Sequence, residues 1–268
     1  MTTKIEWTDD TWNPVTGCTK VSQGCKNCYA ERLWPKVAGA EAKRTGEPPR
    51  AFTNVRCHPE RLDAPLRWRK PRRIFVNSMS DLFHEDVPDE FIDRIFRVMI
   101  GARRHQFQIL TKRPERMREY MAHFHPDDQG WVTRDGAPAM GKVQSSPLFA
   151  DNRFPEPHIW LGVSVEDRET WLERSALLKQ IPAVVRSISY EPALADLGPI
   201  DLTGINWLIA GGESGPKARP SHPDWFRSAR DQCVAAGVAF FMKQITERGR
   251  KQPYEAFPAD LQIREYPA

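Results

Sequence analysis

Six short runs of mostly apolar residues recur along the chain, and a polar turn or a helical pattern follows each of them. The runs cover residues 73–77, 106–110, 158–163, 183–188, 205–210 and 238–242. Short, nearly continuous apolar runs are typical of parallel strands that are buried on both faces. The pattern therefore predicts six buried parallel strands.

The segments between these runs carry apolar residues at helical spacing. Helices are predicted over residues 89–102, 114–124, 167–180 and 221–236. In the first of them, Ile92, Ile95, Phe96 and Met99 share one face. Gly237 follows the last of them and supplies a typical helix end. Strands that alternate with helices of this size predict repeated βαβ units.

Such units build either an open parallel sheet or a barrel, and the polar residues after the strands favour a barrel. In a barrel the carboxyl ends of the strands share one face, where sites form from several loops. We expect an α/β fold, a partial or complete (βα) TIM-type barrel with an N-terminal cysteine loop. The 268 residues fit one domain, 1–268, with insertions near 39–73 and 125–157 that lack clear periodicity.

Composition narrows the class of protein. Apolar residues make up 40% and charged residues 28% of the chain, which excludes a disordered, collagen-like or coiled-coil protein. The net charge of +4 permits a phosphate-rich partner without requiring one. No apolar run approaches the ~20 residues that span a bilayer, and the first residues do not resemble a signal peptide. We expect a cytoplasmic protein with no membrane partner.

Three of the five cysteines lie in one short segment and are the first candidates for chemistry. Cys18, Cys25 and Cys28 have the spacing Cys-x6-Cys-x2-Cys. Thiols crowded in this way suit a metal better than a disulfide framework. Iron–sulfur clusters usually use four thiolates, so three would leave one metal position open for a small molecule.

These cysteines, together with Tyr29 and four later segments, resemble the phage-type three-cysteine-motif proteins. The segments are Phe75-Val-Asn-Ser-Met-Ser-Asp-Leu-Phe83, Leu110-Thr-Lys-Arg-Pro114, Trp160-Leu-Gly-Val-Ser164 and Gly211-Gly-Glu-Ser-Gly215. Members of that family are mostly uncharacterised and look like compact radical S-adenosylmethionine (SAM) enzymes. The resemblance implies that Cys18, Cys25 and Cys28 bind three irons of a [4Fe–4S] cluster. SAM would chelate the fourth iron, and an electron donor would drive its cleavage to a 5′-deoxyadenosyl radical.

The resemblance also suggests residues for SAM, although the chain departs from the common pattern. Six residues rather than three separate the first two cysteines, Asn27 replaces the usual aromatic before the third, and the Gly-Gly-Glu sequence follows a late strand. We expect Asp81 to accept the SAM amino group. The candidates for cofactor binding are Ser78, Asp81, Ser164, Glu166, Gly211, Gly212 and Glu213. Equally, Ser78 and Asp81 are suited to cap a helix, and the glycines to form a tight turn.

Zinc is the alternative metal for the same cysteines. Cys57 or His58 would then complete a tetrahedral site of a common kind. The protein would in that case be a zinc-binding, non-enzymatic, nucleic-acid-binding protein.

Cations in two regions suggest a nucleic acid or nucleotide as the substrate. Lys112, Arg113 and Lys243 follow predicted strands and are candidates for holding a substrate phosphate or carboxylate. The densest basic stretch interleaves Trp68 with Arg56, Arg61, Arg67, Arg69, Lys70, Arg72 and Arg73. Such a stretch is usually a solvated face, but guanidinium groups beside an indole also suit a phosphate backbone and an unpaired base.

Overall fold

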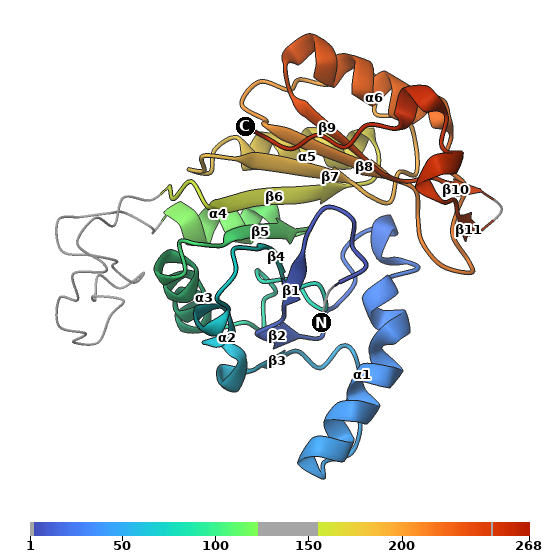
Figure 1. Cartoon of the computed structure of the whole chain (residues 1–268). Helices are drawn as coiled ribbons and strands as arrows, with labels where there is room; N and C mark the ends of the chain where they lie inside the picture. Colours follow the sequence, from blue (N-terminus) through green and yellow to red (C-terminus); the bar gives the residue numbers. More distant parts are fainter. Residues whose placement is uncertain (1–2, 123–154, 248) are drawn as a thin grey trace.

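The computed structural model describes residues 3–122, 155–247 and 249–268, and a curled sheet of seven strands is its central element. All neighbouring strands of this sheet are parallel. In order across the sheet they are β1 (Asp10–Trp12), β4 (Arg73–Val76), β5 (Gln106–Thr111), β6 (Ile159–Val165), β7 (Arg186–Tyr190), β8 (Trp207–Gly211) and β9 (Ala239–Gln244). The sheet forms a half-barrel (Figure 1). A complete barrel is not formed, because β1 and β9 end the sheet instead of pairing with each other.

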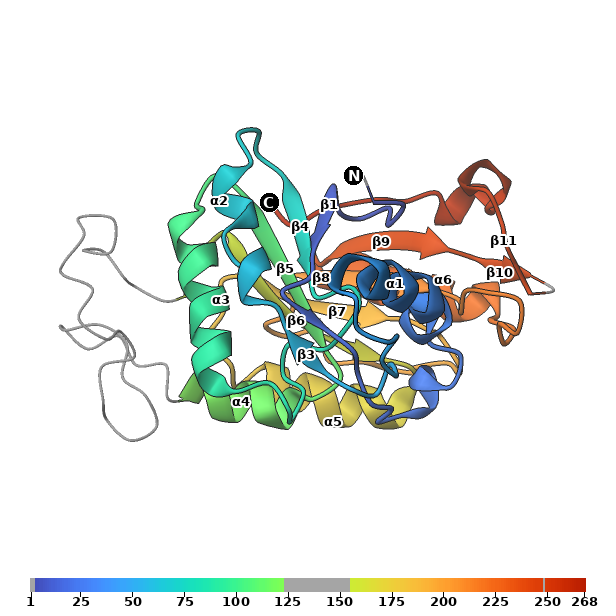
Figure 2. The ribbon, with the colours of Figure 1, turned by 90° about the horizontal axis from the view of Figure 1, so that it is seen from below.

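Helices connect the consecutive strands of the sheet except β7 and β8, which a segment without a helix joins. The helices are α1 (Tyr29–Thr45), α2 (Ala64–Arg67), α3 (Asp89–Gly101), α4 (Pro114–Ala122), α5 (Arg168–Leu178) and α6 (Pro223–Ala236). Two small antiparallel pairs accompany the main sheet: β2 (Val15–Thr16) with β3 (Arg56–Cys57), and β10 (Thr246–Glu247) with β11 (Arg250–Lys251). Figure 2 shows α1 in front of the strands, away from α3, α4 and α5.

The six predicted strands are confirmed as β4 to β9, and the four predicted helices as α3 to α6. Gly237 ends α6 with φ of +66°, as expected. Among the elements that the pattern did not predict, β2 and α1 flank the cysteine segment, and β1 joins the main sheet. The predicted insertion near 39–73 contains the end of α1, β3 and α2. The predicted insertion near 125–157 lies mostly outside the described residues.

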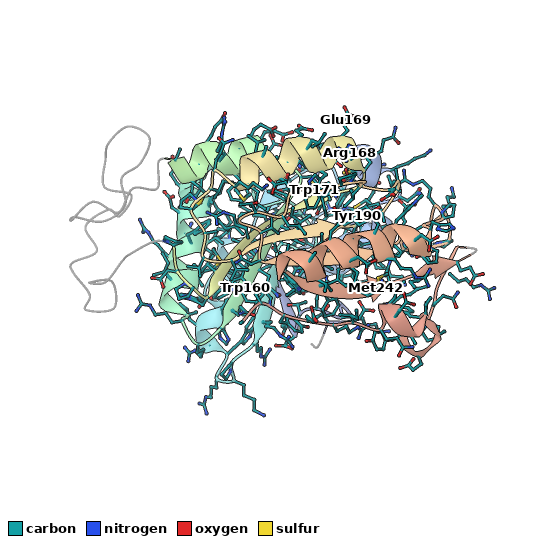
Figure 3. The ribbon with its side chains drawn as sticks, turned by 90° about the horizontal axis from the view of Figure 1, so that it is seen from above. Trp160, Arg168, Glu169, Trp171, Tyr190 and Met242 are labelled. Atoms are coloured by element: carbon teal, nitrogen blue, oxygen red, sulfur yellow. The ribbon has the colours of Figure 1, made fainter. Side chains whose placement is uncertain are left out.

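The large core lies between the sheet and its outer helices. Trp171 of α5 and Tyr190 of β7 are both almost completely buried in it. Seen from above, α5 and α6 lie across the sheet, with Tyr190 between them (Figure 3). The ring of Tyr190 meets that of Phe226 from α6 edge to face at 6.2 Å. These aromatic contacts fix the outer layer against the convex face of the sheet.

A second, smaller core fills the amino-terminal half of the concave face. Its aromatic side chains come from alternate strand positions and from both ends of the chain, because successive strand residues point to opposite faces. They are Trp7, Phe75, Trp160, Trp207, Phe241 and Tyr266. Gly162 lies above them, where a Cβ would come within 2.6 Å of the Ser187 carbonyl oxygen. Side chains therefore fill the amino-terminal end of the half-barrel, and polar groups are left for the carboxyl-terminal end.

The C-terminal segment covers the outer edge of β9. The Met242 amide donates to the Ile263 carbonyl at 2.8 Å, and the Glu265 amide donates to the Phe240 carbonyl at 3.0 Å. Phe241 and Arg264 form an antiparallel bridge between the same two segments. The edge strand thus has a backbone partner over part of its length.

Among the described residues, none of the helices combines the length and the apolar character needed to cross a lipid bilayer.

Candidate functional site

The segment 17–28, which we call the cysteine loop, runs between β2 and α1 along the carboxyl-terminal edge of the sheet. Gly17 begins it with φ of +93°, and a Cβ there would lie 2.7 Å from the Asn54 carbonyl oxygen. Only glycine fits this conformation and this space. The Gly17 amide donates to the Met79 carbonyl at 3.1 Å, which ties the start of the loop to the end of β4.

The first anchor of the loop involves Asp81 after β4 and Arg113 after β5. Arg113 Nη1 lies 3.4 Å from Asp81 Oδ2 and 3.7 Å from Cys18 Sγ. Asp81 also accepts hydrogen bonds from the Thr111 hydroxyl at 2.7 Å and from the Lys112 amide at 3.0 Å. Burial and the Asp81 carboxylate raise the pKa of the Cys18 thiol to about 12, although the Arg113 guanidinium opposes them. Two of the predicted site residues, Asp81 and Arg113, therefore lie beside Cys18. Protein donors, however, already occupy both carboxylate oxygens of Asp81.

The second anchor is Glu166, a fully buried carboxylate at the end of β6. Its Oε1 accepts from the Ser22 hydroxyl of the cysteine loop at 2.9 Å, lies 2.8 Å from Lys112 Nζ and lies 3.3 Å from Arg174 Nη1. Burial opposes the charge of Glu166, but Lys112 and Arg174 outweigh it and hold the pKa of the carboxyl below its ordinary value. A Cβ on Gly24 would lie 2.4 Å from Oε1, so the loop backbone packs directly on this carboxylate.

The second oxygen of Glu166, Oε2, is buried and has no hydrogen-bond partner within the described residues. A buried charged oxygen without a donor is costly, and native structures rarely leave one. This oxygen is therefore a hydrogen-bond acceptor beneath the cysteine loop that no described residue uses.

The third anchor is Glu213, which is 4% exposed in the turn after β8. Its Oε2 accepts from Asn27 Nδ2 at 2.9 Å, from the Arg219 amide at 2.8 Å and from Arg219 Nε at 3.0 Å. Asn27 Nδ2 also donates to the Lys217 carbonyl at 2.9 Å. The segment between Cys25 and Cys28 is therefore fastened to the loop that follows β8.

The remaining predicted residues lie at the same edge but differ in what they can offer a ligand. Lys243 Nζ pairs with Glu191 Oε1 at 2.8 Å, and both Lys112 and Lys243 keep about a fifth of their side chains exposed, at 18% and 21%. Ser78 donates its hydroxyl to Asn13 Oδ1 at 3.2 Å. Ser164 is partly exposed, and its carbonyl accepts from Arg174 at 2.7 Å.

Gly211 and Gly212 form a closely packed turn. A Cβ on Gly211 would lie 2.6 Å from Glu191 Oε1, and one on Gly212 would lie 2.7 Å from Ser221 Oγ. Side chains thus occupy the space beside both glycines. This arrangement favours the tight-turn interpretation of the glycines over direct approach by a cofactor.

The donor set for a metal consists of Cys18, Cys25 and Cys28, all free and partly exposed. Three thiols on one loop have the chemistry that an iron–sulfur cluster requires. Across the described ranges, however, no three His, Cys, Asp or Glu side chains already converge in a way that would hold a metal ion. The three thiols would therefore have to turn toward one another to share a cluster.

The candidate fourth ligands for zinc have other roles in the fold. His58 is 1% exposed; its Nε2 lies 2.7 Å from the Thr16 hydroxyl and its Nδ1 lies 3.1 Å from Glu60 Oε1. Cys57 lies opposite Val15 in the small β2·β3 pair and packs against the large core. Burial raises the pKa of the Cys57 thiol. The fifth cysteine, Cys233, is buried on α6, as expected for a core residue.

The basic stretch begins next to the cysteine loop, where Arg56 pairs with Thr16 of β2, and its cations from Arg67 onward lie at the opposite end of the sheet. It leads into the amino-terminal end of β4, and Figure 2 shows the turn between α2 and β4 far from the cysteine loop. Carboxylates pair with five of its seven cations: Arg56 with Glu47, Arg61 with Glu60, Arg67 with Asp63, Arg72 with Asp10 and Arg73 with Asp9. The Arg72 guanidinium carbon lies over the Trp68 ring, 5.0 Å from its centre. The geometry therefore agrees with a solvated, internally neutralised face.

Sequence reasoning missed four residues that hold the edge together: Ser22, Asn27, Glu191 and Arg219. Ser22 and Asn27 lie inside the cysteine motif, so their position next to the cysteines was a usable signal. Glu191 directly follows a predicted strand, which is also where sites form. Arg219 has no local signal, because its role depends on a turn that brings it back onto Glu213.

Comparison with known proteins shows the family of the chain and nothing beyond it. No curated protein and no solved structure matches the chain. Residues 2–261 match a family described as "Protein of unknown function (DUF5131)", and that description states no activity or cofactor. The match covers almost the whole sequence, the cysteine loop and all seven strands of the half-barrel included. The chain therefore belongs to the DUF5131 family.

Proposed function

We propose that the protein is a radical SAM-like iron–sulfur enzyme that acts on a nucleic acid or a nucleotide. The observation that carries the proposal is the fastening of a three-cysteine loop to the carboxyl-terminal edge of a half-barrel. Buried carboxylates at three strand ends, Asp81, Glu166 and Glu213, hold the loop directly or through Arg113. Sites of βα folds form at this edge. Burying so many charged groups carries a desolvation penalty, which is a high cost for a loop that has only a structural role.

Cys18, Cys25 and Cys28 would hold the cluster, leaving one iron for SAM. A [4Fe–4S] cluster with bound SAM supplies one-electron cleavage of the sulfonium and so a 5′-deoxyadenosyl radical. The protein contributes orientation and exclusion of water. Glu166 Oε2 is the acceptor best suited to a SAM ammonium or hydroxyl group, since it is buried and lacks a donor among the described residues. Asp81 and Glu213 act as supports for the loop, because protein donors surround them.

The substrate class rests on the cations at the same edge. Lys112 and Lys243 are partly exposed beside the loop and carry charges that can be shared between their carboxylate partners and a substrate phosphate. Arg113 is only 9% exposed and is committed to Asp81, Glu85 and the cysteine loop. We therefore assign phosphate contact to the two lysines and loop support to Arg113.

The zinc alternative has weaker support. A closed structural zinc site needs a fourth protein ligand. Protein groups already meet both ring nitrogens of His58, and Cys57 belongs to a separate strand pair. Cys57 nevertheless offers a useful control. Replacing it would remove a metal ligand if the protein binds zinc, but no ligand if Cys18, Cys25 and Cys28 hold an iron–sulfur cluster.

Metal analysis tests the proposal directly. Protein purified without oxygen and reconstituted with iron and sulfide should contain both, and little zinc. Reduction with dithionite in the presence of SAM should release 5′-deoxyadenosine or methionine. Cys25→Ala should lose the iron, the sulfide and the SAM cleavage, whereas Cys57→Ala should keep all three. Stoichiometric zinc without sulfide, or SAM cleavage that persists in Cys25→Ala, would overturn the proposal.

A further inference from the structure

Exposed cations from two distant segments gather beside the cysteine loop. Lys26 lies within the loop, and Arg32 and Lys36 follow on α1, one helical turn apart. Lys217 comes from the turn after β8, and its carbonyl accepts a hydrogen bond from Asn27, the neighbour of Lys26. Arg32 lies over the same turn, since a Cβ on Gly215 would be 3.1 Å from the Arg32 guanidinium carbon. We call the side chains of Lys26, Arg32, Lys36 and Lys217, together with Tyr29, the cysteine-side surface.

The charges of this surface are not neutralised by the protein. All four cationic side chains are exposed, and none forms an ion pair with a carboxylate in the described part of the chain. The basic stretch contrasts with it, because carboxylates pair with five of its seven cations. A cluster of unpaired cations raises the local positive potential and attracts a polyanion. A group of four cations without a described carboxylate partner thus lies beside the cysteine loop.

An aromatic ring lies among these cations. Tyr29 as a residue is 36% exposed, although its hydroxyl is buried and donates to the Ser78 carbonyl. The hydrogen bond restrains the ring while leaving part of it open to solvent. Leu33, one turn further along α1, is also exposed, at 39%. Restrained aromatic rings beside cations are the usual elements for holding single-stranded nucleic acids, because every base has a face that can stack.

We infer that the cysteine-side surface binds single-stranded nucleic acid, with Lys26, Arg32, Lys36 and Lys217 on the phosphates and Tyr29 against a base. The inference deepens the proposed function and rests on it for what happens to the bound strand. A single strand suits this surface better than a duplex, because only an unpaired base has a free face to stack on the partly exposed Tyr29 ring. A strand on this surface passes directly over the cysteine loop.

Binding of a fluorescent, mixed-sequence single-stranded oligonucleotide to the full-length, anaerobically purified protein tests the inference without SAM. The double variant Arg32→Glu/Lys217→Glu should lower the affinity at least tenfold. It should also reduce the slope of log K against log salt by about 1.4, since each lost phosphate contact contributes about 0.7. Tyr29→Leu should lower the affinity about fivefold or more through lost stacking.

The matched control is Arg69→Glu/Lys70→Glu, which reverses two exposed cations of the basic stretch. Neither residue forms an ion pair with a described carboxylate, and both lie at the far end of β4. The control should lose less than threefold in affinity, and both charge-reversal variants should keep the wild-type melting temperature.

Three results would overturn the inference: unchanged binding in Arg32→Glu/Lys217→Glu, an equal or larger loss in the control, or equally effective competition by polyglutamate. The metal analysis and the 5′-deoxyadenosine assay use no oligonucleotide. An iron–sulfur protein that cleaves SAM but does not bind the strand would therefore refute this surface and leave the proposed enzyme standing. A protein that binds the strand but contains no iron would refute the proposed enzyme and leave this surface standing.

Discussion

Replacing Glu213 with Gln should loosen the cysteine loop and destabilise the whole protein. Glu213 is buried and accepts hydrogen bonds from both Asn27 and Arg219. Glutamine keeps the shape of the side chain but has one acceptor oxygen, and its amide group faces donors. Whichever way the amide faces, the substitution thus removes the negative charge and at least one of the hydrogen bonds that Glu213 accepts from Asn27 and Arg219.

The expected loss in free energy of unfolding is about 2–3 kcal/mol. Removing one partner of a fully buried ion pair costs roughly 3–5 kcal/mol. Because 26% of the Arg219 side chain is exposed, water can solvate part of its unpaired charge. We therefore expect a loss below the range for a fully buried pair. For a chain of this size the loss corresponds to a fall in melting temperature of about 4–6 °C.

The pH dependence supplies a second readout. Burial raises the pKa of Glu213, but the hydrogen bonds from Arg219 and Asn27 outweigh burial, so the net shift is downward. A carboxylate with a lowered pKa stabilises the fold fully above its ordinary pKa of about 4.3 and loses that effect as the pH falls through its lower folded-state value. The difference between wild type and Glu213→Gln should therefore be largest near neutral pH and shrink under acid conditions.

Thermal melts from neutral to acid pH, combined with limited trypsin digestion, check the reasoning. Lys20 and Lys26 lie in the cysteine loop, so loosening should accelerate cleavage there before the rest of the fold is cut. Glu173→Gln is the matched control, because Glu173 is exposed on α5 and forms no ion pair with a described residue. A Glu213→Gln protein that melts within about 1 °C of the wild type, or that is cut no faster in the loop, would refute the anchoring role.

Further substitutions test the packing of the loop and the ends of the helices. Gly24→Ala should destabilise by about 1–3 kcal/mol, because its Cβ would lie 2.4 Å from Glu166 Oε1; denaturant unfolding measures this. A Cβ on Gly39 of α1 would have no described neighbour within 4 Å, so Gly39→Ala should stabilise the protein by about 0.5–1 kcal/mol. Equal effects of the two substitutions would contradict the close packing of Gly24 on Glu166. Asp167→Ala removes the capping box that Asp167 forms with Thr170 at the start of α5 and should cost about 1 kcal/mol, visible as a lower denaturation midpoint; an unchanged midpoint would show that the cap contributes nothing.

The strands and helices that sequence alone could predict are those with a strong periodic pattern. β4 to β9 are short and apolar, and α3 carries a clear apolar stripe. α5 buries only two apolar side chains, Trp171 and Leu178, and the Asp167 cap at its start supports its prediction. β1 has only three residues, and its place in the sheet depends on pairing with β4 rather than on its own composition. α1 contains Pro35 and buries only Ala30, Trp34 and Ala38, a stripe too narrow to stand out.

The carboxyl-terminal location of the site could also be predicted, because Asp81, Lys112, Glu166 and Lys243 directly follow predicted strands. The partners of these residues could not. Asn27 and Glu213 are 186 residues apart in the chain, and only the closed fold brings them together. The neutralisation of the basic stretch could not be predicted for the same reason, since Asp9 and Asp10, which pair with part of it, lie more than 60 residues away.

The backbone bonds between the C-terminal segment and β9 have a consequence for handling the protein. A protease that removed residues 262–268 would take away the amide and carbonyl partners of Phe240 and Met242. Tyr266, which shields Trp207 on the concave face, would leave with them. The clipped molecule would present an unpaired strand margin next to uncovered indole surface, a combination prone to association between copies. Trace proteolysis during purification should therefore show itself first as turbidity or high-molecular-weight species.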